Sequence, residues 1–164
     1  MKWLAAVLSA LLVLLAGCGF KLRGAQNFAF ESIAVNAPQN GPVAVELRRA
    51  LGSRVRDGAG PAGAGAPQVT LDVVSEQREK TVVGVNAAGQ VREFQLRIRV
   101  NFKLRSADGK ELIAGNEILQ QRDISFNESA SLAKEAEEGL LYRDMQNDIV
   151  QQVLRRLAAV SLAP

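Results

Sequence analysis

The residue types that usually perform catalysis do not form a complete site in this sequence. The chain has no His and one Cys, which excludes Ser-His-Asp and Cys-His catalysis, His-containing zinc sites, internal disulfides and Cys-x-x-Cys redox centres. Ser131 and Lys134 match a Ser-x-x-Lys pattern, but its companion motifs Ser-Asp-Asn and Lys-Thr-Gly are absent. The acidic neighbours Glu137 and Glu138 would not face each other on a helix. We therefore expect no catalytic residue, no metal ion and no cofactor beyond a covalent lipid.

That lipid is predicted by the single Cys and the segment before it. Residues 1–17 carry one charge, Lys2, followed by the apolar run Trp3–Ala16. A helix of about 14 residues spans about 21 Å, which is short for a bilayer core of roughly 30 Å. The positive start, short apolar core and small final residues are typical of a secretory signal peptide. Leu15-Ala16-Gly17-Cys18 resembles the bacterial lipobox, which is cleaved just before the Cys.

The lipobox resemblance also predicts where the mature chain resides. Cys18 would become the first residue and carry a thioether-linked diacylglycerol and an N-acyl chain, and several acyl chains on one residue give stable anchoring. Gly19, rather than Asp, follows the Cys, which in enteric-type bacteria resembles lipoproteins of the outer membrane. We expect residues 18–164 to be one domain, lipid-anchored on the periplasmic side of that membrane. The alternative is an ordinary signal followed by a Cys that is there by chance.

A row of basic residues is the second chemical feature. Arg97, Arg99, Lys103 and Arg105 alternate with apolar residues over residues 93–105, so one face of the expected strand is apolar and the other basic. Such a row suits phosphate groups, which Arg can bind in a bidentate manner. The abundant phosphorylated partner in the outer membrane is lipopolysaccharide. The alternative is a solvated face that keeps the protein soluble.

Nucleic acid is not an expected partner. The formal net charge is +3 over 164 residues and falls to +2 once Lys2 leaves with the signal, which is too small to indicate nucleic-acid binding. The Gly/Ala/Pro segment at residues 57–67 does not resemble a phosphate-binding loop. It lacks the required Lys-Ser/Thr, and it follows a helical pattern where such a loop follows a strand.

The elements that must position the basic residues can be predicted from periodicity. Alternating apolar residues and turn signals predict four strands, at residues 31–36, 69–85, 93–105 and 112–126. Pro42 begins a helical pattern of about four turns, in which the apolar residues Val43, Leu47, Leu51 and Val55 recur every four positions. A second helix is predicted from residue 127 to about residue 159 by the stripe Met145, Ile149, Val153 and Leu157.

These elements favour an α+β fold. The last three strands form a meander, the first strand joins it, and two amphipathic helices cover the apolar face. The expected architecture is a two-layer sandwich with an approximately four-stranded, mostly antiparallel sheet covered by two helices.

Several segments together resemble one family. The mature start, Cys18–Gly24, resembles the Cys-Gly-[Phe/Trp]-x-Leu-Arg-[Gly/Asp] opening of the LptE (RlpB) family of lipopolysaccharide-assembly lipoproteins. Residues Gly89–Leu96 look like the turn and strand that follow that family's loop, and Leu132–Glu135 with the helix to Leu157 looks like its second helix. The resemblance covers essentially all of residues 18–160.

The resemblance implies a function without catalysis. LptE proteins are outer-membrane lipoproteins that plug the LptD β-barrel, help it assemble, and bind lipopolysaccharide during its insertion into the outer leaflet. Of the two basic positions implicated in lipopolysaccharide binding, one matches Lys134. The other aligns with Ala87, so the nearby Arg92 is the substitute, with Arg97 and Arg99 as further candidates. The alternatives are an ordinary surface role for Lys134 and an independent lipid-binding or envelope-assembly lipoprotein that acts without a barrel.

Overall fold

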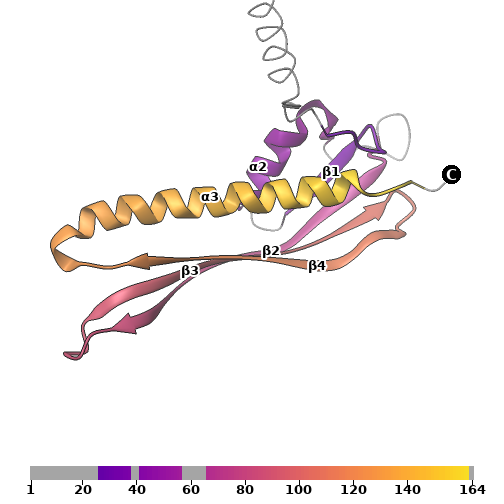
Figure 1. Cartoon of the computed structure of the whole chain (residues 1–164). Coiled ribbons are helices and arrows are strands. Elements are labelled where there is room, and N and C mark those ends of the chain that lie inside the picture. Colours follow the sequence, from indigo (N-terminus) through magenta and orange to yellow (C-terminus); the bar gives the residue numbers. More distant parts are fainter. Residues whose placement is uncertain (1–25, 38–40, 57–65, 163–164) are drawn as a thin grey trace, which may run out of the picture.

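The computed structural model describes residues 26–37, 41–56 and 66–162 (Figure 1). Cys18, the tether that follows it and most of the segment 57–67 lie outside the described residues. The chain forms a four-stranded sheet in the order β1-β2-β3-β4. The strands are β1 (Ile33–Asn36), β2 (Val69–Val85), β3 (Val91–Ser106) and β4 (Glu111–Ser125). Only the β1–β2 pair is parallel, so the predicted mostly antiparallel α+β fold is confirmed.

The meander turns where the sequence predicted. Gly89 and Gly109 both have positive φ, 77° and 88°, a conformation that Gly adopts without a steric penalty. In the first turn the side chain of Asn86 accepts hydrogen bonds from the backbone N–H groups of Ala88 and Gln90. Each turn therefore has a local chemical cause.

The first helix, α2 (Pro42–Leu51), is shorter than predicted. The apolar spacing continues to Val55, but Gly52 adopts φ 56° and ends the α-helix. A single 3-10 turn, η1 (Gly52–Arg54), follows. Val55 then forms an isolated bridge with Ile33 of β1. The backbone of Gly52, rather than the apolar spacing, decides where the helix stops.

The second helix, α3 (Ser131–Ala158), has 28 residues and follows a 3-10 turn, η2 (Glu128–Ala130). The side chain of Asn127 caps that turn by accepting a hydrogen bond from the N–H of Ser129. The four residues of the predicted stripe, Met145, Ile149, Val153 and Leu157, are fully buried. Among the described residues, no helix has the length and apolar character needed to cross a membrane.

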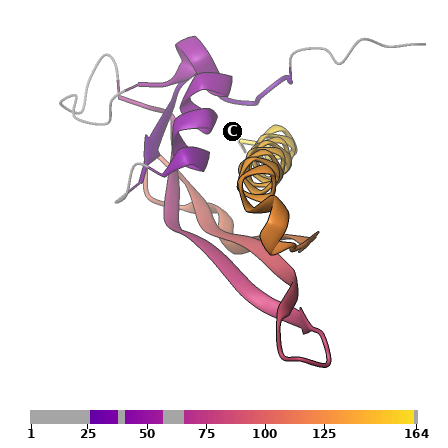
Figure 2. The same cartoon turned by 90° about the vertical axis from the view of Figure 1, so that its left-hand side faces the viewer.

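The two helices lie side by side on one face of the sheet (Figures 1 and 2). The core forms beneath them at one end of the molecule, around β1, α2, the start of β2 and the end of α3, which we call the proximal end. At the other end the β2–β3 hairpin extends away from α3 (Figure 1). We call residues 80–94 together with residues 124–140 the distal end.

Candidate functional site

The distal end contains a small pocket that we call the junction pocket, because β2, β3, the end of β4 and the start of α3 all contribute to it. Its volume is about 120 Å³. Its apolar wall consists of Phe94, Ile124 and Phe126, and its polar wall consists of Lys80, Ser125, Ser131, Lys134, Glu135 and Glu138. Two ammonium groups therefore border one pocket that also has an aromatic wall.

The apolar wall follows from strand alternation. Phe94 has the same parity along β3 as the buried residues Leu96 and Ile98, so it faces α3. Phe94 pairs across the sheet with Ile124, and its ring meets that of Phe126 edge to face at a centroid distance of 5.3 Å. These contacts join β3 to the segment that leads into α3 and so fix the floor of the pocket.

Lys134 lies in the first turn of α3, as the sequence predicted. Its Nζ donates to Ser125 Oγ at 3.0 Å and lies 2.8 Å from Glu137 Oε2. The side chain is only 22% exposed. An ordinary solvated helix lysine would be more exposed, so the geometry favours a lysine aimed at the junction pocket.

Sequence reasoning missed Lys80. Its Nζ lies 2.6 Å from Glu138 Oε2 and 4.4 Å from the centroid of the Phe94 ring. The reason is an irregularity in β2 between Val73 and Ser75, which shifts the alternation by one residue. After this bulge the even-numbered residue Lys80 pairs with Leu96 and faces α3. The charge was visible in the sequence, but the face on which it lies was not.

Arg92 lies next to the junction pocket. It borders a second hollow of about 250 Å³ with Gln90, Val91, Asn127, Glu128 and Ser129. Its backbone carbonyl accepts a hydrogen bond from the N–H of Phe126 at 2.7 Å. Ala87 lies in the exposed turn between β2 and β3. The structure therefore brings Arg92 and Lys134 to the same end of the molecule.

Arg97 and Arg99 lie elsewhere. They have the opposite parity on β3 from Leu96 and Ile98, which are buried under the helices, so they face away from α3 on what we call the open face. Arg99 lies 3.6 Å from Glu117, and Arg97 Nε donates to Gln95 at 2.7 Å. The structure does not bring these two arginines together with Lys134.

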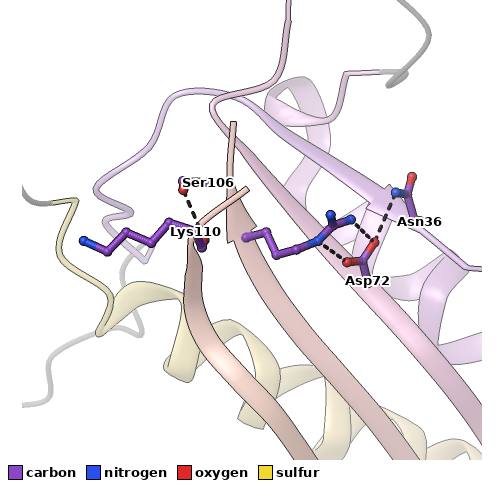
Figure 3. Close-up of polar contacts among 5 residues, drawn as sticks. Asn36, Asp72, Ser106 and Lys110 are labelled. Atoms are coloured by element: carbon purple, nitrogen blue, oxygen red, sulfur yellow. Dashed lines mark hydrogen bonds and ion pairs between the residues drawn. The ribbon is translucent and has the colours of Figure 1, made fainter. Parts of the chain in front are cut away.

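The predicted basic row is also not uniformly basic. β3 is an inner strand, and its neighbours supply acidic partners. Arg105 makes a bidentate contact with Asp72, at 2.8 and 3.2 Å, and Asp72 also accepts from Asn36 at 3.2 Å (Figure 3). The hydrogen bonds and charge of Asp72 raise the pKa of Arg105. This contact ties β1, β2 and β3 together at the proximal end, so we assign Arg105 a structural role.

The described residues contain no group of three or more acidic or Cys side chains placed to hold a metal ion. Ser131 and Lys134 both line the junction pocket, yet the hydrogen-bonded partner of Lys134 is Ser125. The arrangement can therefore bind an anion beside an apolar surface.

Comparison with known proteins points in one direction. The family model "LptE: Lipopolysaccharide-assembly" matches residues 30–157. An LPS-assembly lipoprotein LptE from Photorhabdus laumondii is 28% identical over 149 residues, covering 88% of this chain and 79% of the relative. One from Yersinia enterocolitica is 29% identical over 160 residues, covering 90% of this chain and 72% of the relative.

A solved structure is similar over most of the chain as well. The solution NMR structure of an uncharacterized lipoprotein B from Nitrosomonas europaea has a TM-score of 0.70 and 37% sequence identity. The similarity covers 86% of this chain and 91% of that one. The α+β fold described here is therefore shared with a protein that is itself described as a lipoprotein.

Proposed function

Because the chain belongs to the LptE lipopolysaccharide-assembly family, we propose that it is an outer-membrane lipoprotein that plugs and helps assemble the LptD barrel. In the same proposal it binds lipopolysaccharide during insertion of that lipid into the outer leaflet. Cys18 carries the lipid anchor. The protein acts by binding and positioning, without catalysing a reaction.

The observation that carries the proposal is the composition of the distal end. Lys80 and Lys134 lie there beside the aromatic wall of the junction pocket, and Arg92 borders the second hollow at the same end. Five large apolar side chains of the same region are 46–81% exposed, namely Val82, Val83, Val85, Leu132 and Leu140. Cations beside exposed apolar side chains fit a lipid whose phosphates adjoin its acyl chains. Lipopolysaccharide has this chemistry.

The length of the molecule supports its proposed position inside the LptD barrel. Gln26 follows Cys18 by eight residues, so an extended chain of this length places the anchor within about 29 Å of the described fold. That junction is at the proximal end, where Phe30 is buried in the core. The 28 residues of α3 span about 42 Å, so the distal end lies far from the anchor. Such a molecule can begin at the periplasmic leaflet and present its cations deep within a barrel.

The open face suits the inside of a barrel. Arg99 with Glu117 and Arg105 with Asp72 form ion pairs on it, so its charges are of both signs and are partly neutralised by neighbours. The lumen of an outer-membrane barrel is polar. A mixed polar face can exchange hydrogen bonds with such a surface, whereas a strongly basic one would select for anions only.

Lipopolysaccharide binding is tested by charge reversal at the distal end. We expect Lys134→Glu combined with Arg92→Glu to lose most of the binding of purified lipopolysaccharide, because two cations become two like charges facing the phosphates. The control is Arg49→Glu with Lys110→Glu, which changes the net charge equally but lies at the proximal end and the β3–β4 turn. Equal binding by both double variants would reject the site.

The barrel is tested by affinity capture. The lipidated chain, purified from detergent-solubilised outer membranes, is expected to retain LptD in an equimolar amount. An independent lipid-binding lipoprotein would bind lipopolysaccharide yet be recovered without a large barrel. That result would favour the alternative function over the plug.

A further inference from the structure

Both lysines of the junction pocket are already occupied by carboxylates of the same protein. Glu137 Oε2 lies 2.8 Å from Lys134 Nζ, and Glu138 Oε2 lies 2.6 Å from Lys80 Nζ. The two glutamates are consecutive on α3. Because successive helical side chains point about 100° apart, each reaches a different lysine.

Each of these two ion pairs joins one partly buried side chain to one exposed side chain. The side chains of Lys134 and Glu138 are each 22% exposed, whereas those of Lys80 and Glu137 are 38% and 49% exposed. Partial removal from water strengthens the attraction and reduces its screening by salt. An incoming anion therefore competes with charged groups that are already in place.

The Lys80–Glu138 pair also spans two elements that are distant in sequence. Lys80 belongs to β2 and Glu138 to α3, 58 residues later. The Lys80 ammonium lies over the Phe94 ring, which gives it a second favourable partner if Glu138 is displaced. Lys80 can therefore remain at the pocket with or without its carboxylate.

We propose that Glu137 and Glu138 gate the junction pocket, and that Lys80 is a second phosphate-binding residue beside Lys134. In the free protein each carboxylate pairs with a lysine ammonium that a ligand phosphate would contact, Glu138 from the pocket lining and Glu137 from beside it. A phosphorylated lipid displaces them, and the carboxylates return when the lipid leaves. This inference rests on the proposed function, since it assumes that the distal end binds lipopolysaccharide.

The gate gives the site two properties that a transport protein needs. It lowers the affinity for phosphorylated lipid, because the ion pairs must be broken first, and so it favours release of the cargo. It also favours a ligand with two phosphates over one with a single phosphate, because only the former can compensate both lysines after both carboxylates move away.

The test measures binding of diphosphoryl lipid A in detergent micelles at physiological ionic strength. We expect Glu137→Gln with Glu138→Gln to bind about tenfold more tightly than the unmodified chain, because Gln carries no charge and no ion pair then has to be broken before the phosphates bind. Glu137→Gln alone should give part of this gain while it keeps the Lys80–Glu138 pair and the attachment of β2 to α3. Lys80→Met should weaken binding.

The matched control is Glu135→Gln. Glu135 lines the same pocket, and the ion pairs of Lys80 and Lys134 are made with other glutamates. It therefore corrects for the general effect of removing one negative charge. Lipid A whose phosphates have been removed is the control ligand, and the gain should vanish with it.

The outcomes separate this inference from the proposed function. If the unmodified chain binds lipid A through Lys134 but neither Glu137→Gln nor the double variant exceeds Glu135→Gln, the gate is rejected and the proposed function stands. A gain that persists with dephosphorylated lipid A rejects the gate as well. If the unmodified chain shows no saturable binding, or Lys134→Glu leaves it unchanged, the proposed function fails and the gate fails with it.

Discussion

Glu76 illustrates how one side chain can join two elements. It lies on β2, yet its carboxylate accepts the backbone N–H of Val43 at the start of α2, at 3.1 Å. Gly41, the residue before the helix, leaves space for it, since a Cβ there would collide with that carboxylate. No side chain within α2 provides this cap, so the strand supplies it. The local sequence around Pro42 predicted where the helix starts but not which residue caps it.

Burial changes the proton affinity of Glu76. Desolvation raises its pKa above 4.5, and the Val43 N–H bond and the charge of Arg78 lower it only in part. The folded state therefore holds this proton more tightly than the unfolded state does. As the pH rises through 4.5 and then through the raised pKa, the contribution of Glu76 to the free energy of unfolding must fall.

We therefore expect the unmodified chain to lose stability relative to Glu76→Gln over this pH range, because Gln cannot ionise and its oxygen can still accept the Val43 N–H. Glu76→Ala should instead cost about 1 kcal/mol through loss of the cap. Urea unfolding of the three proteins between pH 4 and pH 7 measures both effects. A stability difference between the unmodified chain and Glu76→Gln that does not vary with pH would contradict the account.

The basic residues show which positions could be predicted from the sequence and which required the structure. The positions of Lys134 at the start of α3 and of Arg92 just beyond the β2–β3 turn could be predicted from local signals, whereas their role in binding stays a prediction. Lys80 could not be placed, because the bulge at Val74 reverses which residues of β2 face α3. The basic row containing Arg97 and Arg99 was real, but its acidic partners, such as Glu117, come from a neighbouring strand and depend on register.

At the scale of elements, the β2–β3 hairpin carries the distal end, so its turn must hold it in register. Gly89 has φ 77°, and the N–H of Asn86 bonds to the carbonyl of Gln90 across the turn at 2.9 Å. The sequence predicted this turn and the lengths of the three long strands well. Their alternation and turn residues are local signals, which need no knowledge of the rest of the fold.

Gly89→Ala should therefore destabilise the protein by about 1–2 kcal/mol, because an L-residue is strained at this φ. Gly115→Ala is the matched control. Gly115 lies within β4, an added Cβ there would meet open space, and its φ is not positive. Thermal unfolding compares the two variants. A destabilisation of Gly115→Ala as large as that of Gly89→Ala would show that turn strain is not the cause.

Other elements depend on contacts that are distant in sequence. The apolar spacing from Val43 to Val55 extends the predicted first helix by a turn, whereas Gly52 ends it. Val55 then contributes to a bridge with β1. The apolar spacing does not show whether Val55 is covered as part of a helix or as part of a β-bridge. The end of α2 therefore could not be predicted from the sequence.

The whole molecule has two ends with different roles. The proximal end contains most of the core and lies nearest the predicted anchor at Cys18. The distal end has little core beneath the hairpin and exposes both cations and apolar side chains. We propose that this separation lets one domain be held in the membrane at one end and contact lipopolysaccharide at the other.

The central claim is that lipopolysaccharide meets the distal end, and site-specific photocrosslinking tests it most directly. A photoreactive amino acid is placed at Leu132, which is 81% exposed, or at Lys110 in the β3–β4 turn, in the full lipidated chain in its own cells. We predict a lipopolysaccharide adduct from position 132 and none from position 110. An adduct at position 110 with none at position 132 would contradict the account.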